Sequence, residues 1–267
     1  KARAGIDDDP VDRVDAERRI LACSDLVLAS TTDERDQLAS LYDVDRDRVE
    51  VVAPGVEHAL FSPGGRTRAK RALGLDGRRV LLFVGRIQPL KGADLAAAAL
   101  AALDDPNATL VVVGGASGAD GEAEMTRLHA LVHDLGIGDQ VRFVAPQPHH
   151  RLADFYRAAD VCLVPSRTES FGLVALEAAA CGTPVVAAAV GGLRSLVDDG
   201  HTGFLVSSRD PEDWAAPVAV LLDDPDLRAE MGISANARAR RYSWSITAGR
   251  LRRLYGDLVA REPVRCS

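Results

Sequence analysis

The sequence predicts an α/β protein built around parallel β-sheets. Short apolar runs alternate with helical patterns along the chain, and most of the runs stop at Gly, Pro or Ser. Hydrophobic residues make up 47% of the chain but aromatic residues only 4%, so Ala, Val and Leu must fill the core, as they do where helices pack on a parallel sheet. Alternating strands and helices imply right-handed crossovers, and ligands then bind at the carboxyl ends of the strands.

The elements follow one another in a regular order. Seven apolar runs are expected to form buried strands, at residues 25–30, 49–55, 79–85, 109–115, 140–146, 160–166 and 183–192. Helical patterns lie between them, at residues 13–22, 32–42, 68–75, 92–103, 122–136, 150–159 and 171–182. After about residue 207 the chain turns helical, and residues 243–260 predict one long closing helix.

A Pro- and Gly-rich segment divides this series in two. Residues 53–66 predict a linker between two sheets. Residues 1–62 hold only two strands and two helices, which is too little for an independent domain, so we interpret them as the remnant of an N-terminal Rossmann-like domain with its linker. Residues 63–267 then form a second Rossmann-like domain with its closing helix. The chain starts at Lys1 without a signal-peptide pattern, so we expect the true N-terminus to be absent.

Composition excludes several classes of partner. The net charge of −7, from 32 basic and 39 acidic residues, argues against nucleic acid or an anionic membrane as partner. No apolar stretch reaches the roughly 18 residues of a membrane span. The four cysteines are scattered without C-x-x-C spacing, and we interpret them as reduced thiols of a cytoplasmic protein.

The sequence motifs give little support for a metal site or a dinucleotide-binding site. His129 and His133 are four residues apart on a predicted helix, but the Glu of an H-E-x-x-H zinc motif is missing, so we expect no metal site. The run TLVVVGGASGADG, residues 109–121, lacks the G-x-G-x-x-G spacing of a dinucleotide fingerprint. An NAD-dependent oxidoreductase is therefore disfavoured.

Two glutamates frame a predicted helix start. Glu169 and Glu177 are eight positions apart, and Gly172 stands between them where a helix is expected to begin after a strand. A helix N-terminus suits a phosphate or a sugar oxygen, and Gly lets a ligand approach the backbone. At about 1.5 Å per residue the carboxylates would lie roughly 12 Å apart, which fits the two sugar rings of a nucleotide-sugar. The alternative is that Glu177 is a solvated helix residue and Glu169 a loop charge.

Two cations follow another strand end. Arg86 comes directly after the predicted strand at 79–85, and Lys91 lies five residues later in the same loop. An Arg fork and a Lys point charge together suit a diphosphate. The alternative is a solvated basic loop.

These motifs resemble those of a known family. GRIQPLKG (85–92), ESFGLVALE (169–177) and ACGTPVVAAAVGGL (180–193), followed by DDGHTGFLV (198–206), resemble the retaining glycosyltransferases of the GT-B fold that contain the sucrose and sucrose-phosphate synthases. Within that family, FVGRIQPLKGAD (83–94), VVVGGASG (111–118), PQP (146–148) and residues 155–177 are most similar to enzymes of mycothiol biosynthesis. The resemblance covers essentially the whole chain from residue 13 onward.

The resemblance implies a fold and a reaction. Two Rossmann-like domains would face each other, the C-terminal one holding the nucleotide-sugar and the N-terminal one the acceptor. The implied reaction moves N-acetylglucosamine from UDP-N-acetylglucosamine to 1D-myo-inositol 3-phosphate, with retention and without metal or cofactor. The UDP-sugar is then a co-substrate, and a sugar or inositol phosphate is the other small-molecule partner. A homodimer is also compatible with the family.

The resemblance also assigns roles to residues. The catalytic group would be Arg86 and Lys91, which bind the diphosphate, together with Glu169, which holds the hexose. Backbone amides of Ser170, Phe171, Gly172 and Leu173 would help to bind the hexose, Glu177 would bind the ribose, and Gln147 would read the uracil. Arg13 would contact the acceptor phosphate.

Departures from the family keep alternatives open. The N-terminal half of the family, with its Gly-rich loop, a site His and most acceptor contacts, is missing, so we expect a fragment. Arg194 stands where relatives often have Pro, and Arg167 and Thr168 precede Glu169 where other residues are common. A related transferase with another hexose or acceptor, or a non-catalytic nucleotide-sugar-binding fragment, are the alternatives.

Overall fold

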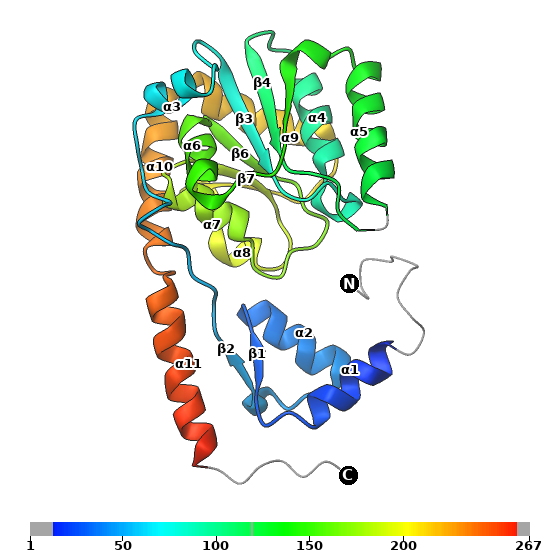
Figure 1. Ribbon diagram of the computed structural model, residues 1–267, viewed down its shortest axis with the longest axis vertical. Helices are drawn as coiled ribbons and strands as arrows, with labels where there is room; N and C mark the ends of the chain where they lie inside the picture. Colours follow the sequence, from blue (N-terminus) through cyan, green and yellow to red (C-terminus); the bar gives the residue numbers. More distant parts are fainter. Residues whose placement is uncertain (1–12, 119, 261–267) are drawn as a thin grey trace.

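The computed structural model describes residues 13–118 and 120–260 and divides into two bodies of unequal size (Figure 1). The larger body, residues 66–239, contains a six-stranded parallel sheet in the order β5-β4-β3-β6-β7-β8. The smaller body, residues 13–51, contains the parallel pair β1-β2 with two helices. The strands are β1 (Val27–Ala29), β2 (Val49–Val51), β3 (Arg79–Val84), β4 (Ala108–Val113), β5 (Val141–Val144), β6 (Val161–Val164), β7 (Val185–Ala188) and β8 (Gly203–Val206).

Helices connect these strands and close the chain. They are α1 (Arg13–Ala22), α2 (Thr32–Tyr42), α3 (Arg66–Ala72), α4 (Ala93–Leu103), α5 (Gly121–Asp134), α6 (His149–Ala158), α7 (Leu173–Ala180), α8 (Leu193–Leu196), α9 (Pro211–Asp223), α10 (Pro225–Ala239) and α11 (Trp244–Val259). The described residues also form the short 3₁₀ turns η2 (Arg46–Arg48), η3 (Pro89–Lys91) and η4 (Gly138–Gln140).

The strand order creates a switch point in the larger sheet. From β3 the chain moves outward through α4 and α5 to β4 and β5, and it then returns to β6 and moves outward the other way. Helix α4 packs on α9 and α5 on one side, whereas α7 packs on α6 and α10. The loops after β3 and β6 therefore diverge at adjacent carboxyl ends, where ligands of such sheets bind.

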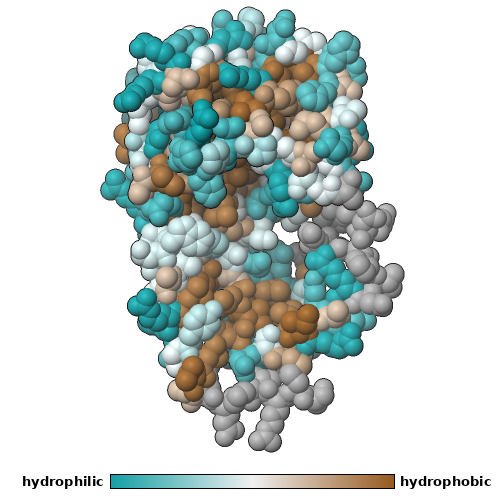
Figure 2. Space-filling view, viewed as in Figure 1, coloured by the Kyte–Doolittle hydropathy of each residue, from teal (hydrophilic) through white to brown (hydrophobic). Residues whose placement is uncertain are grey.

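The main core lies in the larger body. Its central strands β4, β6 and β7 are buried along their whole length, and Leu81, Leu82, Leu110 and Leu163 are fully buried. A smaller cluster of Val27, Ala29, Val44 and Val49 holds β1 and β2 on α2. The space-filling view shows apolar side chains gathered on the surface of the lower part of the molecule (Figure 2).

The segment expected to be a linker packs along the larger body. Val56 pairs with Ser243 in an isolated bridge, and Phe61 is buried with its ring edge against Tyr156. Helix α11 starts beside this crossing and runs back along the smaller body (Figure 1). There the Thr247 hydroxyl donates to the Ala53 carbonyl at 2.8 Å, and Arg250 pairs with Glu50 at 2.9 Å.

The structure confirms all seven predicted strands in shortened form and adds two elements. Strand β8 and helix α8 were not predicted, because each has only four residues and shows no period of its own. Helix α7 begins at Leu173, two residues later than expected, because Gly172 before it has φ 106°. No helix among the described residues combines the length and apolar character needed to cross a lipid bilayer.

The three cysteines that the structure describes divide into two kinds. Cys162 and Cys181 are free and buried, and burial raises the pKa of the Cys162 thiol well above its usual range and that of Cys181 to about 12. Both are therefore protonated and inert at neutral pH. The expectation of reduced thiols is wrong for Cys23, which is disulfide-bonded.

Candidate functional site

The loops after β3 and β6 bring a cation and a carboxylate together. Lys91 Nζ donates to Glu169 Oε2 at 2.8 Å, with the two side chains 26% and 17% exposed. The Ser166 hydroxyl donates to the same carboxylate oxygen at 3.3 Å. Although the two residues are 78 positions apart, the switch point between β3 and β6 makes them neighbours. A partly desolvated pair of this kind can bind an anion through the lysine and hydroxyls through the carboxylate.

Arg86 stands apart from this pair at the end of β3. Its side chain is exposed, and it forms no hydrogen bond or ion pair with the residues that the structure describes. The next residue, Ile87, is fully buried and bridges Ala116, which anchors the loop that carries the arginine. The guanidinium is therefore available to a ligand.

Arg86 and Gln147 line the same depression. This hollow of about 360 Å³ lies over the ends of β3, β4 and β5, and its lining also includes Gly85, Gly114 and Pro146. The Gln147 side chain donates to the Ala145 carbonyl at 2.9 Å. A flat ring could lie in this hollow with the cation at its rim.

The start of α7 presents free backbone donors. The amides of Ser170, Phe171, Gly172 and Leu173 have no hydrogen-bond acceptor among the described residues. A side chain at Gly172 would be strained at φ 106°, and its Cβ would lie 2.7 Å from the Leu193 Cδ2 atom. The sequence therefore keeps a glycine beside amides without an acceptor, which suit an anion or a sugar oxygen.

Glu177 lies farther along α7 and is largely buried. The Tyr156 hydroxyl donates to Glu177 Oε2 at 2.8 Å. Burial raises the pKa of the Glu177 carboxyl, and the hydrogen bond from Tyr156 and the nearby His149 act in the opposite direction. Glu177 is thus not a solvated helix residue, and its unfavourable burial is typical of a functional carboxylate.

Sequence reasoning did not single out Tyr156 or Ser166. Each contacts a predicted site glutamate, but Tyr156 is on α6 and no local spacing connects it to Glu177. Ser166 is the last residue of an expected strand run, and its burial at 2% exposure is what shows that it belongs to the site.

A cleft of about 550 Å³ separates the two bodies. Helix α2 forms one wall, and the loops that follow β6 and β7 form the other. The lining residues are Asp33, Glu34, Gln37, Leu38, Leu41, Tyr42, Arg167, Thr168, Glu169, Ser170, Ala189, Val190, Gly191 and Arg194. The size is ordinary for a small-molecule site. We call this space the interbody cleft.

Arg13 does not line the interbody cleft. Its Nε donates to Glu17 Oε1 at 2.7 Å, and Glu17 in turn accepts from the hydroxyl of Tyr42, which does line the cleft. Both hydrogen bonds lower the pKa of Glu17. Arg13 therefore reaches the cleft through two intervening side chains in this arrangement, and its acceptor role stays a prediction.

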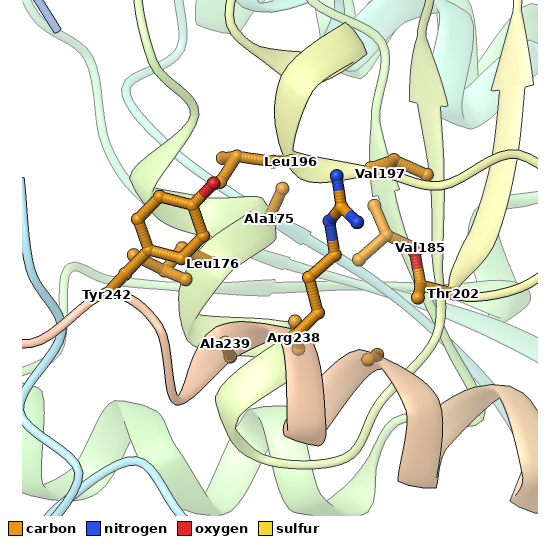
Figure 3. A pocket seen from close by; sticks show the side chains of 11 residues that line it. Ala175, Leu176, Val185, Leu196, Val197, Thr202, Arg238, Ala239 and Tyr242 are labelled. Atoms are coloured by element: carbon orange, nitrogen blue, oxygen red, sulfur yellow. The ribbon is translucent and has the colours of Figure 1, made fainter. Parts of the chain in front are cut away.

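A packed joint supports the cleft wall from behind. Figure 3 shows Arg238 of α10 pointing toward α8, among Ala175, Leu176, Val185, Leu196 and Val197. Its terminal nitrogen donates to the Ser195 carbonyl at 2.7 Å. The enclosed space is only about 10 Å³, too small for a ligand, so the joint positions α8 and does not bind a substrate.

Comparison with known proteins identifies the group. The family model described as "Glycosyl transferases group 1" matches residues 65–238. A D-inositol 3-phosphate glycosyltransferase from Frankia alni is 50% identical over 254 residues, covering 92% of this chain and 62% of that protein. The enzyme of the same name from Acidothermus cellulolyticus is 48% identical over 260 residues, covering 94% of this chain and 57% of that protein.

Solved structures agree with this match. A sucrose-phosphate synthase from Thermosynechococcus elongatus superposes with a TM-score of 0.87 at 34% identity, covering 95% of this chain and 63% of that one. Anabaena HepE in complex with UDP-glucose superposes with a TM-score of 0.81 at 25% identity, covering 87% and 64%. The expected GT-B type of α/β fold is confirmed. The chain spans about three fifths of the length of the relatives it matches, and it belongs to the glycosyl transferases group 1 family.

Proposed function

We propose that this chain carries the donor half of a retaining, metal-independent glycosyltransferase that moves N-acetylglucosamine from UDP-N-acetylglucosamine to 1D-myo-inositol 3-phosphate. The observation that carries the proposal is the Lys91–Glu169 pair, at 2.8 Å, with Glu169 in the loop that leads to α7, whose first amides have no acceptor among the described residues. The names of the two curated relatives reported above support the choice of acceptor. HepE, crystallised with UDP-glucose, supports a UDP-sugar as donor.

The proposed chemistry is stabilisation of a leaving diphosphate. Arg86 and Lys91 would neutralise the charge that develops when the glycosidic bond breaks, a contribution usually worth several kcal/mol. Glu169 and the amides from Ser170 to Leu173 would orient the hexose. In the ligand-free structure Lys91 neutralises Glu169, so a bound diphosphate would share the lysine with that carboxylate. The departing phosphate would help to deprotonate the acceptor hydroxyl.

The nucleoside would lie along the larger sheet. Glu177 would accept hydrogen bonds from the ribose hydroxyls, and backbone groups at Gln147 would read the uracil in the hollow that also contains Arg86. No metal ion or cofactor is part of this proposal. We further propose that residues 1–62 belong to an acceptor-side domain, that residues 63–267 form the donor-side domain, and that Arg13 contacts the acceptor.

A second candidate function differs from the first in the hexose that is transferred. UDP-glucose is the nucleotide-sugar in the HepE structure. A transferase of glucose would keep the same roles for Arg86, Lys91 and Glu177. It would differ in what Glu169 and its neighbours contact.

Calorimetric titration of the 267-residue chain tests the proposal. UDP, UDP-N-acetylglucosamine, UDP-glucose, GDP-mannose and NAD would be compared. We expect UDP-N-acetylglucosamine to bind most tightly, Glu177→Ala to weaken UDP, and Glu169→Ala to reduce only the extra affinity that the sugar confers. Preference for UDP-glucose would favour the second candidate. Binding of NAD alone, or of nothing, would contradict a donor site in this chain.

A further inference from the structure

Tyr156 is a polar side chain that the fold buries completely. It lies on α6 with 0% of its surface exposed, and its hydroxyl donates to Glu177 Oε2 at 2.8 Å. A phenylalanine could fill nearly the same volume without a group that needs a hydrogen-bond partner. Packing alone therefore does not explain a hydroxyl at this core position.

Neighbouring residues hold the tyrosine in place. The buried Thr183 hydroxyl donates to the Tyr156 carbonyl at 2.6 Å, which fixes the backbone at the end of α6 against the start of β7. The ring of Phe61 meets the tyrosine ring edge-on, with 5.9 Å between the ring centroids and 68° between the planes. A buried ring held on both sides has little freedom to turn, so its hydroxyl has a defined position.

The carboxylate that accepts this hydrogen bond has no cationic partner. Glu177 forms no ion pair with a lysine or arginine of the described residues, in contrast to Glu169, which pairs with Lys91 at 2.8 Å. A cation would bind the carboxylate more strongly than a neutral hydroxyl does and would compete with the hydroxyls of a ligand. An ionised carboxylate has about four acceptor positions, so one bond from Tyr156 leaves enough for two more hydroxyls.

Helix α6 connects this contact to the hollow over the strand ends. Leu152 lines the hollow together with Arg86 and Gln147. Tyr156 follows four residues later on the same face of α6, and this helix packs on α7, which carries Glu177 (Figure 1). The helix that borders the hollow therefore also brings the tyrosine hydroxyl to the carboxylate.

We infer that Tyr156 is a positioning residue of the donor site, whose hydroxyl holds one oxygen of Glu177 so that the carboxylate accepts both ribose hydroxyls of the nucleotide. The inference rests on the proposed function, because it concerns the carboxylate assigned there to the ribose. It adds a requirement on the ligand, since only a nucleotide with a vicinal diol gains affinity from Tyr156. A nucleotide without the two hydroxyls is indifferent to it.

Calorimetry with two nucleotides tests this role. UDP and 2′,3′-dideoxyuridine 5′-diphosphate would be titrated into the parent, Tyr156→Phe, Glu177→Ala, the double variant that combines these two changes, and Tyr255→Phe. We call the ratio of the two affinities the hydroxyl preference. Tyr255 is 58% exposed on α11, so its variant controls for the loss of a phenol hydroxyl. Thermal unfolding of each protein is measured first, to show that it is folded at the titration temperature.

We expect the parent to prefer UDP by about tenfold or more, and Tyr156→Phe to reduce this preference by about threefold or more. The affinity of Tyr156→Phe for the dideoxynucleotide should equal that of the parent. Glu177→Ala should abolish the preference, and adding Tyr156→Phe to Glu177→Ala should change neither affinity, because no carboxylate is left to position. Tyr255→Phe should behave as the parent does.

The inference is overturned if Tyr156→Phe keeps the hydroxyl preference or weakens both nucleotides equally. It is also overturned if the double variant binds UDP more weakly than Glu177→Ala, a comparison that holds even if Tyr156→Phe alone does not fold. Equal binding of the two nucleotides by the parent would overturn it together with the ribose role of Glu177. Failure of the parent to bind either nucleotide would instead overturn the proposed donor site, on which the inference rests.

Discussion

At the scale of single residues, Glu177 combines a stability cost with a proposed binding role. Its carboxyl is largely buried in the larger body, and desolvation is the main reason why its pKa is raised. A group whose pKa is higher in the folded than in the unfolded chain reduces stability as the pH rises past its unfolded value. Removing this charge should therefore stabilise the ligand-free protein.

The substitution Glu177→Gln tests whether the buried charge of Glu177 lowers the stability of the ligand-free protein. The amide oxygen can still accept the hydrogen bond from Tyr156, so only the charge is lost. We expect the melting temperature of the ligand-free chain to rise by about 2 °C at pH 7.5. The gain should shrink as the pH falls toward 4, because the carboxyl of the parent then becomes protonated first in the folded and then in the unfolded state.

Differential scanning fluorimetry at both pH values measures the effect, with Glu230→Gln as control because Glu230 is exposed on α10. A variant less stable than the parent at pH 7.5, or a gain that does not shrink at pH 4, would contradict the argument. The same variant should bind UDP more weakly, because a neutral amide is a poorer acceptor for ribose hydroxyls than a carboxylate.

At the scale of elements, one buried carboxylate joins four of them. Asp160 precedes β6 at the edge of the sheet opposite the candidate site. Its Oδ2 accepts from Lys70 of α3 at 2.6 Å and from the amide of Val80 in β3 at 2.8 Å. Arg66 and Arg228 approach Oδ1 at 3.9 and 3.8 Å. Burial is the main cause of the lowered pKa of Arg66, and the nearby carboxylate of Asp160 partly offsets this lowering.

The substitution Asp160→Asn should therefore be costly. It leaves three cations around a neutral amide, and breaking a buried pair from one side typically costs about 3–5 kcal/mol. We expect the melting temperature to fall by about 8 °C or more, with UDP affinity at 20 °C unchanged. Asp154→Asn, which removes a half-exposed pair with Arg157, should change it by less than about 3 °C. Equal effects of the two variants on thermal unfolding would refute this account.

Elements with local signals were predictable from the sequence, whereas side-chain contacts between packed helices were not. Helices α2 and α11 match their predicted ranges to within a residue, because their apolar patterns are continuous; in the structure Thr31 and Ser243 cap them. The proximity of Lys91 to Glu169 follows from the rule for parallel sheets. The contact of Tyr156 with Glu177 joins two helices through their packing, which no spacing in the sequence encodes.

At the scale of the whole molecule, the two bodies are joined by two chain segments that touch. A Cβ atom on Gly55 would lie 2.2 Å from the Trp244 amide nitrogen and 2.3 Å from the Ser243 carbonyl carbon. Only a glycine allows the segment leaving the smaller body to pass so close to the start of α11. The position of α11 beside the smaller body depends on this approach.

The substitution Gly55→Ala should loosen α11. We expect amide hydrogen exchange in residues 244–259 to become faster by about tenfold. The reason is that the segment at residue 55 and the start of α11 must move apart to make room for the Cβ atom. Gly256→Ala is the matched control, since a Cβ there meets nothing within 4 Å and alanine favours the helix. Unchanged exchange of α11 in Gly55→Ala would show that the contact does not hold the helix.

The paired crossing also determines how the interbody cleft can open. Val56 and Ser243 are bridged where one segment enters the larger body and the other leaves it. The segment before Val56 and the segment after Ser243 therefore cross between the two bodies at the same place. A single connecting segment would allow the bodies to twist and slide against each other. The motion left to the two bodies is rotation about this crossing, so binding and release of a ligand should change the width of the cleft mouth while the walls keep their register.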